Sequence, residues 1–547
     1  MNPQDEVHSA VRTSTLAGVT SPIRRSAVVR YPAQTAGLRR GWRSDTLPVS
    51  PGSPITSAKE THTSIAGRAA AGVAWNFATG LSVKALGLGG TLLLTRFLGP
   101  GDFGDVWAAV IVVDTATRFS DYNLGNYVVT RQTDPNLTFQ AFVYHVGAMA
   151  SACLVVTLFR HPIASALGSP GVAAYVPWLA LARVLLQISR IPESILYRAL
   201  RFRTLALIRA GGDVAYTVVS VILAPVLGGA TVVAGNLARA ATLTGTILAR
   251  SNRSEWLQPG ALRLSAARDM VSFGFPLSAK SLVDNLSSSW DNLLVSRFFG
   301  NQVMGQYRLA YNLADITGLV TDAMSDVLLP SLARLDLFRQ RLALPRIAAM
   351  MGLVIFPLIT GLALVAPLAV TALLAPQWAG VAPLLTILCF KSVPVPFDAV
   401  FASYFAARGR TTVMMYLGIA KLALVLGFLL TLGQLGPRWA CVAVVLAFHL
   451  SSVLALLAGW RLEQLSPGPL IAATLRPLAA SALMAAAVLL FRITMARWIA
   501  TPVWLDLALE VTVGAFAYVG AAFLVARPTA IAFIDVARGL VFRKAAQ

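Results

Sequence analysis

The stretch "RFLGPGDFG", residues 96–104, interrupts a chain rich in alanine, valine and leucine, and a related stretch, "RFFGNQVMG", lies at residues 297–305. Setting Arg96 on Arg297 gives an offset of 201 residues. The same register pairs Leu92 with Leu293, Phe97 with Phe298, Gly99 with Gly300, Gly104 with Gly305, Asp114 with Asp315 and Asp121 with Asp322. Apolar identities are common among membrane helices, but shared arginine, glycine and aspartate positions are not. The sequence therefore predicts an internal duplication.

Each copy of this stretch is expected to form the tight outer turn between the first and second helices of a repeat. Glycine permits the backbone angles of a tight turn, and Pro100 is suited to open the next helix. The arginine is expected at the water interface, where its charged end stays hydrated.

Composition indicates a membrane protein with many spans. Of the 547 residues, 56% are hydrophobic and only 13% are charged, and the mean hydropathy is +0.68. Apolar runs of helix-spanning length recur from Gly67 to Arg527. A soluble fold is excluded on these grounds, and the alternating pattern of an outer-membrane barrel is absent from the sequence.

The apolar runs predict an all-α polytopic membrane protein with about fourteen transmembrane helices. Six spans separate the two copies of the motif, and an even number means that both halves insert with the same orientation. This implies a pseudo-twofold axis along the membrane normal, as in transporters built from parallel repeats. The expected spans lie near 69–95, 103–129, 139–159, 172–194, 205–227, 230–249, 270–296, 304–330, 347–368, 380–406, 412–433, 438–460, 470–494 and 503–526.

Four domains are predicted. Residues 1–66 form a disordered basic cytoplasmic tail, since they are rich in Ser, Thr, Pro and Arg and cannot bury a core. Residues 67–251 and 252–462 form two six-helix bundles, and 463–547 add two transmembrane helices and a short cytoplasmic C-terminus. Basic residues cluster in alternate loops, which places both termini in the cytoplasm. This spread also explains the net charge of +21 without nucleic acid.

No cofactor is expected. Cys153, Cys389 and Cys441 lie in apolar runs without metal or redox spacing, so packing is their expected role. The five histidines are scattered and suggest no metal site. A nucleotide-binding loop of the G-x-x-x-x-G-K-[ST] type is absent from the sequence, which excludes direct ATP hydrolysis by this chain.

Charged residues within the apolar runs are the candidate functional groups, because each costs several kcal/mol near the bilayer centre. They fall on helical faces at spacings of three, four and seven residues. These stripes are Lys280, Asp284, Ser288 and Asp291; Arg308, Asp315, Asp322 and Asp326; Asp114, Arg118 and Asp121; and the single Lys84 in the first span.

Three segments carry a resemblance to a known family: "LLLTRFLGPGDFGDVW", "DNLLVSRFFGNQVMGQYRLAYNLAD" and "YRALRFRTLALI". They resemble the lipid-linked oligosaccharide flippases (O-antigen and exopolysaccharide) of the polysaccharide transporter family. Its superfamily, the multidrug/oligosaccharidyl-lipid/polysaccharide exporters, also holds multidrug and toxin extrusion antiporters and the lipid II flippase. The resemblance covers roughly residues 67–460, and the long basic N-terminal tail departs from it.

The resemblance implies two bundles facing a central cavity, with the last two helices packed outside. The implied activity is transport by alternating access, without enzymatic chemistry: an undecaprenyl-pyrophosphate-linked oligosaccharide crosses from the cytoplasmic to the periplasmic leaflet of a bacterial inner membrane. Implied partners are this substrate, membrane lipids, and the polysaccharide polymerase and chain-length machinery. Nucleic acid is not among them.

A path for such a substrate needs cations for the phosphates. We expect Lys84, Arg118, Lys280 and Arg308 to bind phosphate, and Asp291, Asp315 and Asp322 to hold a coupling proton or sodium ion. Lys391, Asp398 and Lys421 have a weaker claim. A structural alternative remains open, since Asp114 with Arg118 and Lys280 with Asp284 form i,i+4 pairs that neutralise one another.

Two rival functions are considered. A multidrug and toxin extrusion-type antiporter would favour acidic groups for cationic cargo, whereas Lys and Arg stand among the acids here. A membrane glycan polymerase or ligase would carry a long external catalytic loop, whereas every expected outer connection is short. The flippase is therefore the favoured function.

Overall fold

The computed structural model describes residues 86–130, 135–199, 201–318, 321, 332, 336–495 and 502–535. All of them belong to the compact unit Ser64–Gln547. These residues form helices joined by short connections, without a strand in the described ranges. The predicted all-α class is confirmed, while Lys84, Asp322 and the tail 1–66 lie outside the described residues.

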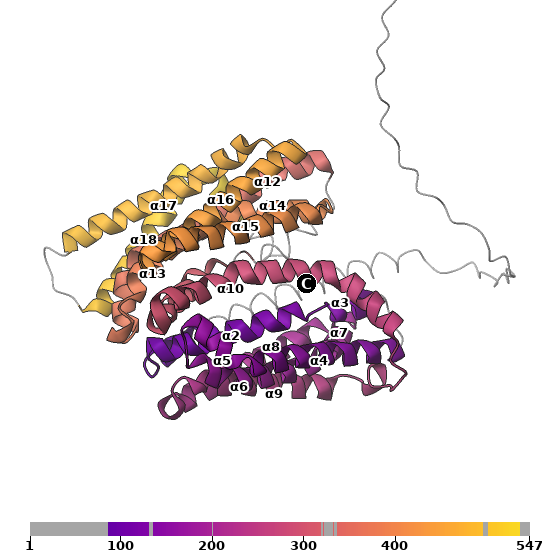
Figure 1. Ribbon diagram of the computed structural model, residues 1–547. Coiled ribbons are helices and arrows are strands. Elements are labelled where there is room, and N and C mark those ends of the chain that lie inside the picture. The colour runs from indigo at the N-terminus through magenta and orange to yellow at the C-terminus, as the bar shows by residue number, and fades with distance from the viewer. Residues whose placement is uncertain are drawn as a thin grey trace, which may run out of the picture. The chain divides into compact units, whose positions relative to one another are not determined.

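The helices follow one another along the chain in two series (Figure 1). The first series is α2 (Pro100–Phe119), α3 (Leu124–Thr130), α4 (Pro135–Leu158), α5 (Arg160–Leu167), α6 (Val172–Ile188), α7 (Arg190–Arg198), α8 (Phe202–Leu227) and α9 (Ala230–Arg250). The second is α10 (Leu264–Ala314), α12 (Leu337–Leu373), α13 (Val381–Cys389), η3 (Phe390–Ser392), α14 (Val395–Ala407), α15 (Thr411–Thr431), α16 (Pro437–Glu463), α17 (Pro467–Met495) and α18 (Val503–Val525).

Within the described ranges, ten helical segments are long and apolar enough to cross a membrane. Large apolar side chains such as Val226, Phe516 and Leu524 are exposed on them, as lipid contact requires. α2 and α10 are not among the ten, and both carry the charged stripes that the sequence singled out. The chain is thus a multi-pass membrane protein whose least apolar long helices hold its candidate functional groups.

The repeated motif forms a turn, as predicted, but its glycines have two different roles. α10 is two helices joined at Gly300, whose φ of 80° is left-handed and suits glycine. Pro100 lies at the start of α2, as predicted. Gly104 and Gly305 instead lie inside helices, so their interpretation as turn residues is wrong. They have to be small because α2 and α10 come into close contact at these two glycines.

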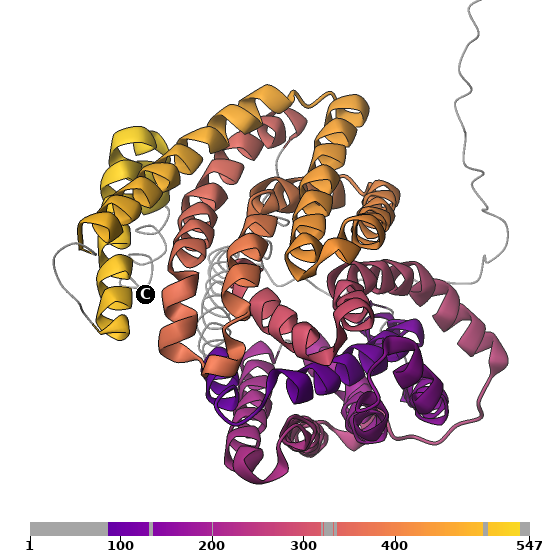
Figure 2. The ribbon, with the colours of Figure 1, turned by 60° about the vertical axis from the view of Figure 1, so that its left-hand side comes forward.

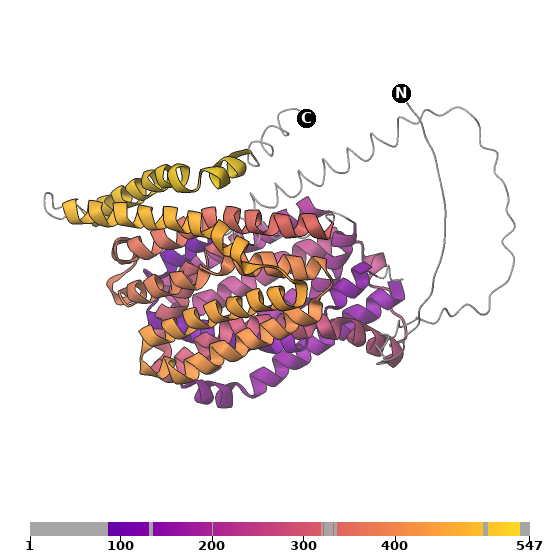
Figure 3. The same cartoon turned by 90° about the horizontal axis from the view of Figure 1, so that it is seen from above.

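α10 is the element that connects the two series. It packs against α2, α3, α4 and α5 of the first series and against α13, α15 and α16 of the second (Figure 2). The C-terminal helices α17 and α18 pack against each other and against α12 (Figure 3). α10 therefore lies between the two sets of helices.

One buried ion pair ties α17 to α18 and α12. Arg492 donates to both carboxylate oxygens of Glu510, at 2.7 and 2.6 Å, and to the backbone oxygen of Leu364 at 2.9 Å. Glu510 is buried, whereas Arg492 is partly exposed. The pair fixes the helix hairpin on α12.

Replacing Glu510 with glutamine is expected to lower the free energy of unfolding by about 1 kcal/mol, because a bidentate pair is lost but the remaining Arg492 is partly exposed and screened by solvent. Thermal unfolding of the purified protein measures the change. Asp336→Asn is the matched control, since Asp336 and Arg339 form an exposed pair and asparagine keeps the helix cap. Equal losses in both variants would contradict a structural role for the Glu510 pair.

Candidate functional site

α2 and the part of α10 that follows Gly300 approach each other closely at Gly104 and Gly305. A β-carbon on Gly104 would collide with the backbone oxygen of Asn301, and one on Gly305 would collide with that of Pro100. Pro100 and Asn301 are also 201 residues apart, so the two contacts are reciprocal. Reciprocal contacts between equivalent positions are what a twofold axis produces. The axis therefore passes between these two glycines.

A second pair of reciprocal contacts lies beside the glycines. Trp378, just before α13, donates its indole N–H to the backbone oxygen of Thr95 at 2.9 Å. Ser169, just before α6, has its hydroxyl 3.4 Å from that of Ser296. Thr95 and Ser296 are again 201 residues apart. A side chain of each half thus contacts the equivalent position, Thr95 or Ser296, of the other half. Both contacts lie at the expected outer end.

Polar side chains join α2 to α10 at this end. Asp105 accepts a hydrogen bond from the Ser169 hydroxyl at 2.9 Å and another from the side-chain amide of Asn301. The equivalent of Asp105 is Gln306, whose amide donates to the backbone oxygen of Gln377 at 3.3 Å. α2 and α10 are therefore closed against each other at the end that begins with Pro100.

Arg308 lies further along the same contact, opposite its own equivalent, Trp107. Its guanidinium carbon is 4.6 Å from the centre of the Trp107 ring, a cation–π contact between the two series of helices. The Nε atom of Arg308 is buried and has no hydrogen-bond partner among the described residues. Asp291 and Asp315 lie within electrostatic range. A half-buried guanidinium with a spare donor is suited to binding an anion.

Asp291 is held in a fixed position. It is 1% exposed and accepts a hydrogen bond from the Tyr307 hydroxyl at 2.8 Å. Its other oxygen accepts from the backbone and side-chain amides of Asn292, at 2.9 and 2.7 Å. Both oxygens therefore have neutral donors within the described structure.

Asp315 forms an ion pair with Lys391, which the sequence had given a weaker claim. The ammonium is 3.0 Å from the carboxylate and 3.4 Å from the centre of the Tyr311 ring. Lys421 lies 3.6 Å from the centre of the Phe448 ring, within electrostatic range of Asp315. One feature of the sequence could have indicated the importance of Lys391. It is a lysine in an apolar run, and two prolines follow it within five residues, in "KSVPVP".

The other predicted cations lie in more open surroundings. Lys280 pairs with Asp284 at 2.7 Å, as the i,i+4 spacing predicted, and both side chains are exposed. Arg118 is exposed in the last turn of α2. Asp114 pairs with Arg183 of α6, in place of the expected Arg118. The i,i+4 spacing permitted a pair with Arg118, but α6 packs beside α2 and brings a second arginine to the same carboxylate.

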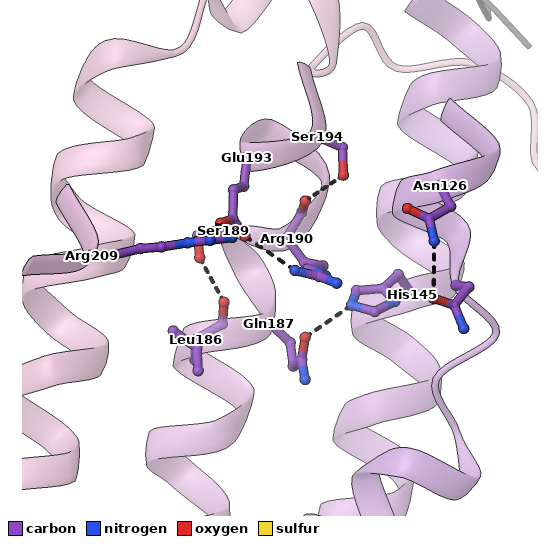
Figure 4. Close-up of polar contacts among 10 residues, drawn as sticks. Asn126, His145, Leu186, Gln187, Ser189, Arg190, Glu193, Ser194 and Arg209 are labelled. Carbon is purple, nitrogen blue, oxygen red and sulfur yellow. Dashed lines mark hydrogen bonds and ion pairs between the residues drawn. The ribbon is translucent and has the colours of Figure 1, made fainter. Parts of the chain in front are cut away.

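A polar cluster stabilises the junction of α6 and α7 (Figure 4). Glu193 lies between Arg190, at 3.3 Å, and Arg209 of α8, at 2.7 Å. His145 of α4 lies 3.1 Å from the side-chain oxygen of Gln187. These contacts join α4, α6, α7 and α8 where α6 ends.

With this geometry in view, comparison with known proteins identifies the family. The family described as polysaccharide biosynthesis protein matches residues 93–383, more than half of the chain. The chain belongs to this family.

Two curated relatives extend the match. The chain is 24% identical over 391 residues to the lipopolysaccharide biosynthesis protein WzxC of Escherichia coli (strain K12), covering 70% of this chain and 78% of that protein. It is 24% identical over 338 residues to the succinoglycan biosynthesis transport protein ExoT of Rhizobium meliloti (strain 1021), covering 60% of this chain and 67% of that protein.

Two solved structures share the fold. Lipid II flippase MurJ in an inward closed conformation superposes with a TM-score of 0.68 at 13% identity, covering 83% of this chain and 99% of that chain. An inward-facing multidrug resistance MATE transporter gives 0.56 at 15% identity, covering 70% and 95%. The chain therefore shares the fold of these two transporters.

Proposed function

We propose that this polysaccharide biosynthesis protein moves an undecaprenyl-pyrophosphate-linked oligosaccharide from the cytoplasmic to the periplasmic leaflet by alternating access. Family membership and the curated relatives support a role in exporting a polysaccharide precursor. No covalent bond is made or broken in such a step. The chain must instead provide binding groups and a path that opens to one side at a time.

The position of Arg308, whose Nε is unpaired within the described structure, is the observation that supports this proposal most directly. A pyrophosphate cannot cross hydrocarbon without cationic partners. Arg308 lies half-buried where the two halves meet, and its buried Nε has no partner among the described residues. Lys84, Arg118 and Lys280 complete the proposed set of phosphate ligands. Lys280 and Arg118 are exposed, as groups that meet a substrate on entry should be.

Ion coupling is proposed for Asp291, Asp315 and Asp322. Of the two that the structure describes, Asp291 is enclosed by Tyr307 and Asn292, whereas the Asp315 side chain is 62% exposed. Asp315 is therefore the carboxylate that a proton or sodium ion reaches without rearrangement of its own helix.

The proposed setting is a bacterial inner membrane with both termini in the cytoplasm. The two proposed bundles are residues 67–251 and 252–462, with 463–547 packed outside them and 1–66 as a cytoplasmic tail. A polysaccharide polymerase and chain-length machinery would take the substrate after release at the periplasmic face.

The double variant Lys280→Ala/Arg308→Ala is expected to insert normally but to stop surface polysaccharide. Because the substrate then loses two phosphate contacts, its lipid-linked precursor should accumulate on the cytoplasmic leaflet. Surface polymer and extracted lipid-linked sugar are measured in cells whose own copy of the gene is deleted. Asp336→Asn, far from these residues in sequence and exposed, is the control for membrane insertion. Normal polymer output from the double variant would remove these residues from the proposal.

A multidrug and toxin extrusion-type antiporter is the alternative function. Such a protein would protect cells against cationic compounds, and its loss would leave lipid-linked sugars unchanged. The same deletion strain therefore separates the two functions. A membrane glycan polymerase is a weaker alternative, and its loss would leave lipid-linked repeats already on the periplasmic leaflet.

A further inference from the structure

Lys391 lies at a break inside a membrane span. The span Val381–Ala407 is interrupted by η3, which contains Lys391, between α13 and α14. Pro394 and Pro396 follow directly and cannot continue regular helical hydrogen bonding. Broken helices near the middle of a membrane are typical of binding sites in transporters.

The ammonium of Lys391 is buried, whereas its counterion is exposed. The Lys391 side chain is 3% exposed, covers the face of Tyr311 at 3.4 Å and lies 5.8 Å from the Phe448 ring centre. Asp315, 3.0 Å away, has a side chain that is 62% exposed and lies at the C-cap of α10. A negative charge at a helix C-terminus is not stabilised by the helix dipole. The pairing with Lys391 is therefore what holds this carboxylate in place.

The first half repeats the arrangement. Asp114, the equivalent of Asp315, pairs with Arg183 of α6. α6 and α13 begin at the N-cap residues Gly171 and Gly380, and Arg183 and Lys391 follow them at nearly the same distance along the chain. The Asp114–Arg183 pair lines a cavity of about 100 Å³. In the first half an aspartate of α2 thus faces a cation of α6. In the second half the aspartate at the end of α10 faces a cation of η3, which follows α13.

A buried cation in a membrane needs a counter-charge at all times, because an unpaired charge is costly at low dielectric. When no substrate is bound, only a protein carboxylate is available to supply it. An incoming pyrophosphate carries more negative charge than one carboxylate does. It also offers several oxygens that accept hydrogen bonds. It is therefore able to replace an exposed carboxylate at a buried ammonium.

We propose that Lys391 is a further pyrophosphate ligand and that Asp315 occupies its place until the substrate arrives. This rests on the proposed function and adds a binding residue on the broken span Val381–Ala407 to the ligands on α2 and α10. Lys421, Asp291 and Arg308 are the other charged groups around the site. When Asp315 moves away, the cations Lys391, Lys421 and Arg308 outnumber Asp291, the one carboxylate among these groups, and this excess of positive charge favours an anion.

Titration of the purified full-length protein with inorganic pyrophosphate, followed by calorimetry, tests this arrangement. Lys391→Met should weaken binding roughly tenfold or more, since a charge-assisted contact is lost, and Lys391→Arg should restore most of it. Asp315→Asn should tighten binding roughly threefold to tenfold, because the competing carboxylate is gone. Asp336→Asn controls for the same change in net charge and should leave binding within about twofold.

A purely structural ion pair gives a different pattern, in which Asp315→Asn binds pyrophosphate no more tightly than Asp336→Asn. That result, or wild-type binding by Lys391→Met, would overturn the role of this pair. If Asp315→Asn does not fold, carbodiimide labelling of the wild-type protein replaces it. Pyrophosphate should then increase labelling at Asp315, and unchanged or reduced labelling would refute displacement. No saturable binding of pyrophosphate by the wild type would also overturn this ligand role, whereas the proposed function itself fails only if the protein does not speed transfer of the lipid-linked sugar across vesicle membranes.

Discussion

A valine at position 305 is expected to reduce transport at least a hundredfold. A β-carbon at Gly305 collides with the backbone oxygen of Pro100, an atom that cannot move aside as a flexible side chain can. α2 and α10 would be forced apart at the outer end, at a cost of about 3 kcal/mol to the closed state. Alternating access requires that end to close when the other opens. Flipping of a fluorescent lipid-linked sugar in vesicles measures the loss.

The reciprocal geometry sharpens this prediction. Gly104→Val should cause a loss of similar size, because Gly104 meets the backbone oxygen of Asn301 in the same way. Gly101→Val is the matched control on α2, since no atom lies within 4 Å of a β-carbon there. Equal transport by Gly101→Val and Gly305→Val would show that the contact at the axis does not matter.

Replacing Arg308 with alanine is expected to lower the transport rate about a hundredfold. The guanidinium lies half-buried at the junction of the halves, and in the proposed function it donates charge-assisted hydrogen bonds to the pyrophosphate. Arg308→Lys should recover part of the rate, because lysine keeps the charge but loses the planar fork. Initial rates at several substrate concentrations separate weaker binding from slower movement.

Trp107 separates binding from packing at this position. Trp107→Ala removes the cation–π partner but no charge, so a loss of only about fivefold is expected. If Trp107→Ala and Arg308→Ala lost activity equally, and Arg308→Lys recovered none of it, Arg308 would be a packing residue rather than a phosphate ligand.

The duplication and much of the fold were predictable from the sequence because periodicity and repeated polar positions are local signals. The offset that joins Arg96 to Arg297 also joins Gly104 to Gly305, and those glycines meet. The turn at Gly300 and the helix start at Pro100 were predicted for the right reasons. The role of Gly104 could not be predicted in this way, since a close approach of two helices depends on residues about 200 positions away in the chain.

Pairing between charges was less predictable for the same reason. The spacing of Lys280 and Asp284 on one helix was enough to predict their contact. Asp114 also had a candidate partner four residues along its helix, but the packing of α6 against α2 brought Arg183 to it. Lys391 had no acidic partner three or four residues away, and only the fold shows that it meets Asp315.

The most direct test places a fluorescent undecaprenyl-pyrophosphate oligosaccharide in one leaflet of vesicles that contain the purified protein. Appearance of the label in the opposite leaflet is then measured with a quencher that does not cross the membrane. The proposed function predicts transfer well above that of protein-free vesicles, and loss of this excess in Lys280→Ala/Arg308→Ala. Transfer no faster than in protein-free vesicles, or equally fast with the double variant, would contradict it.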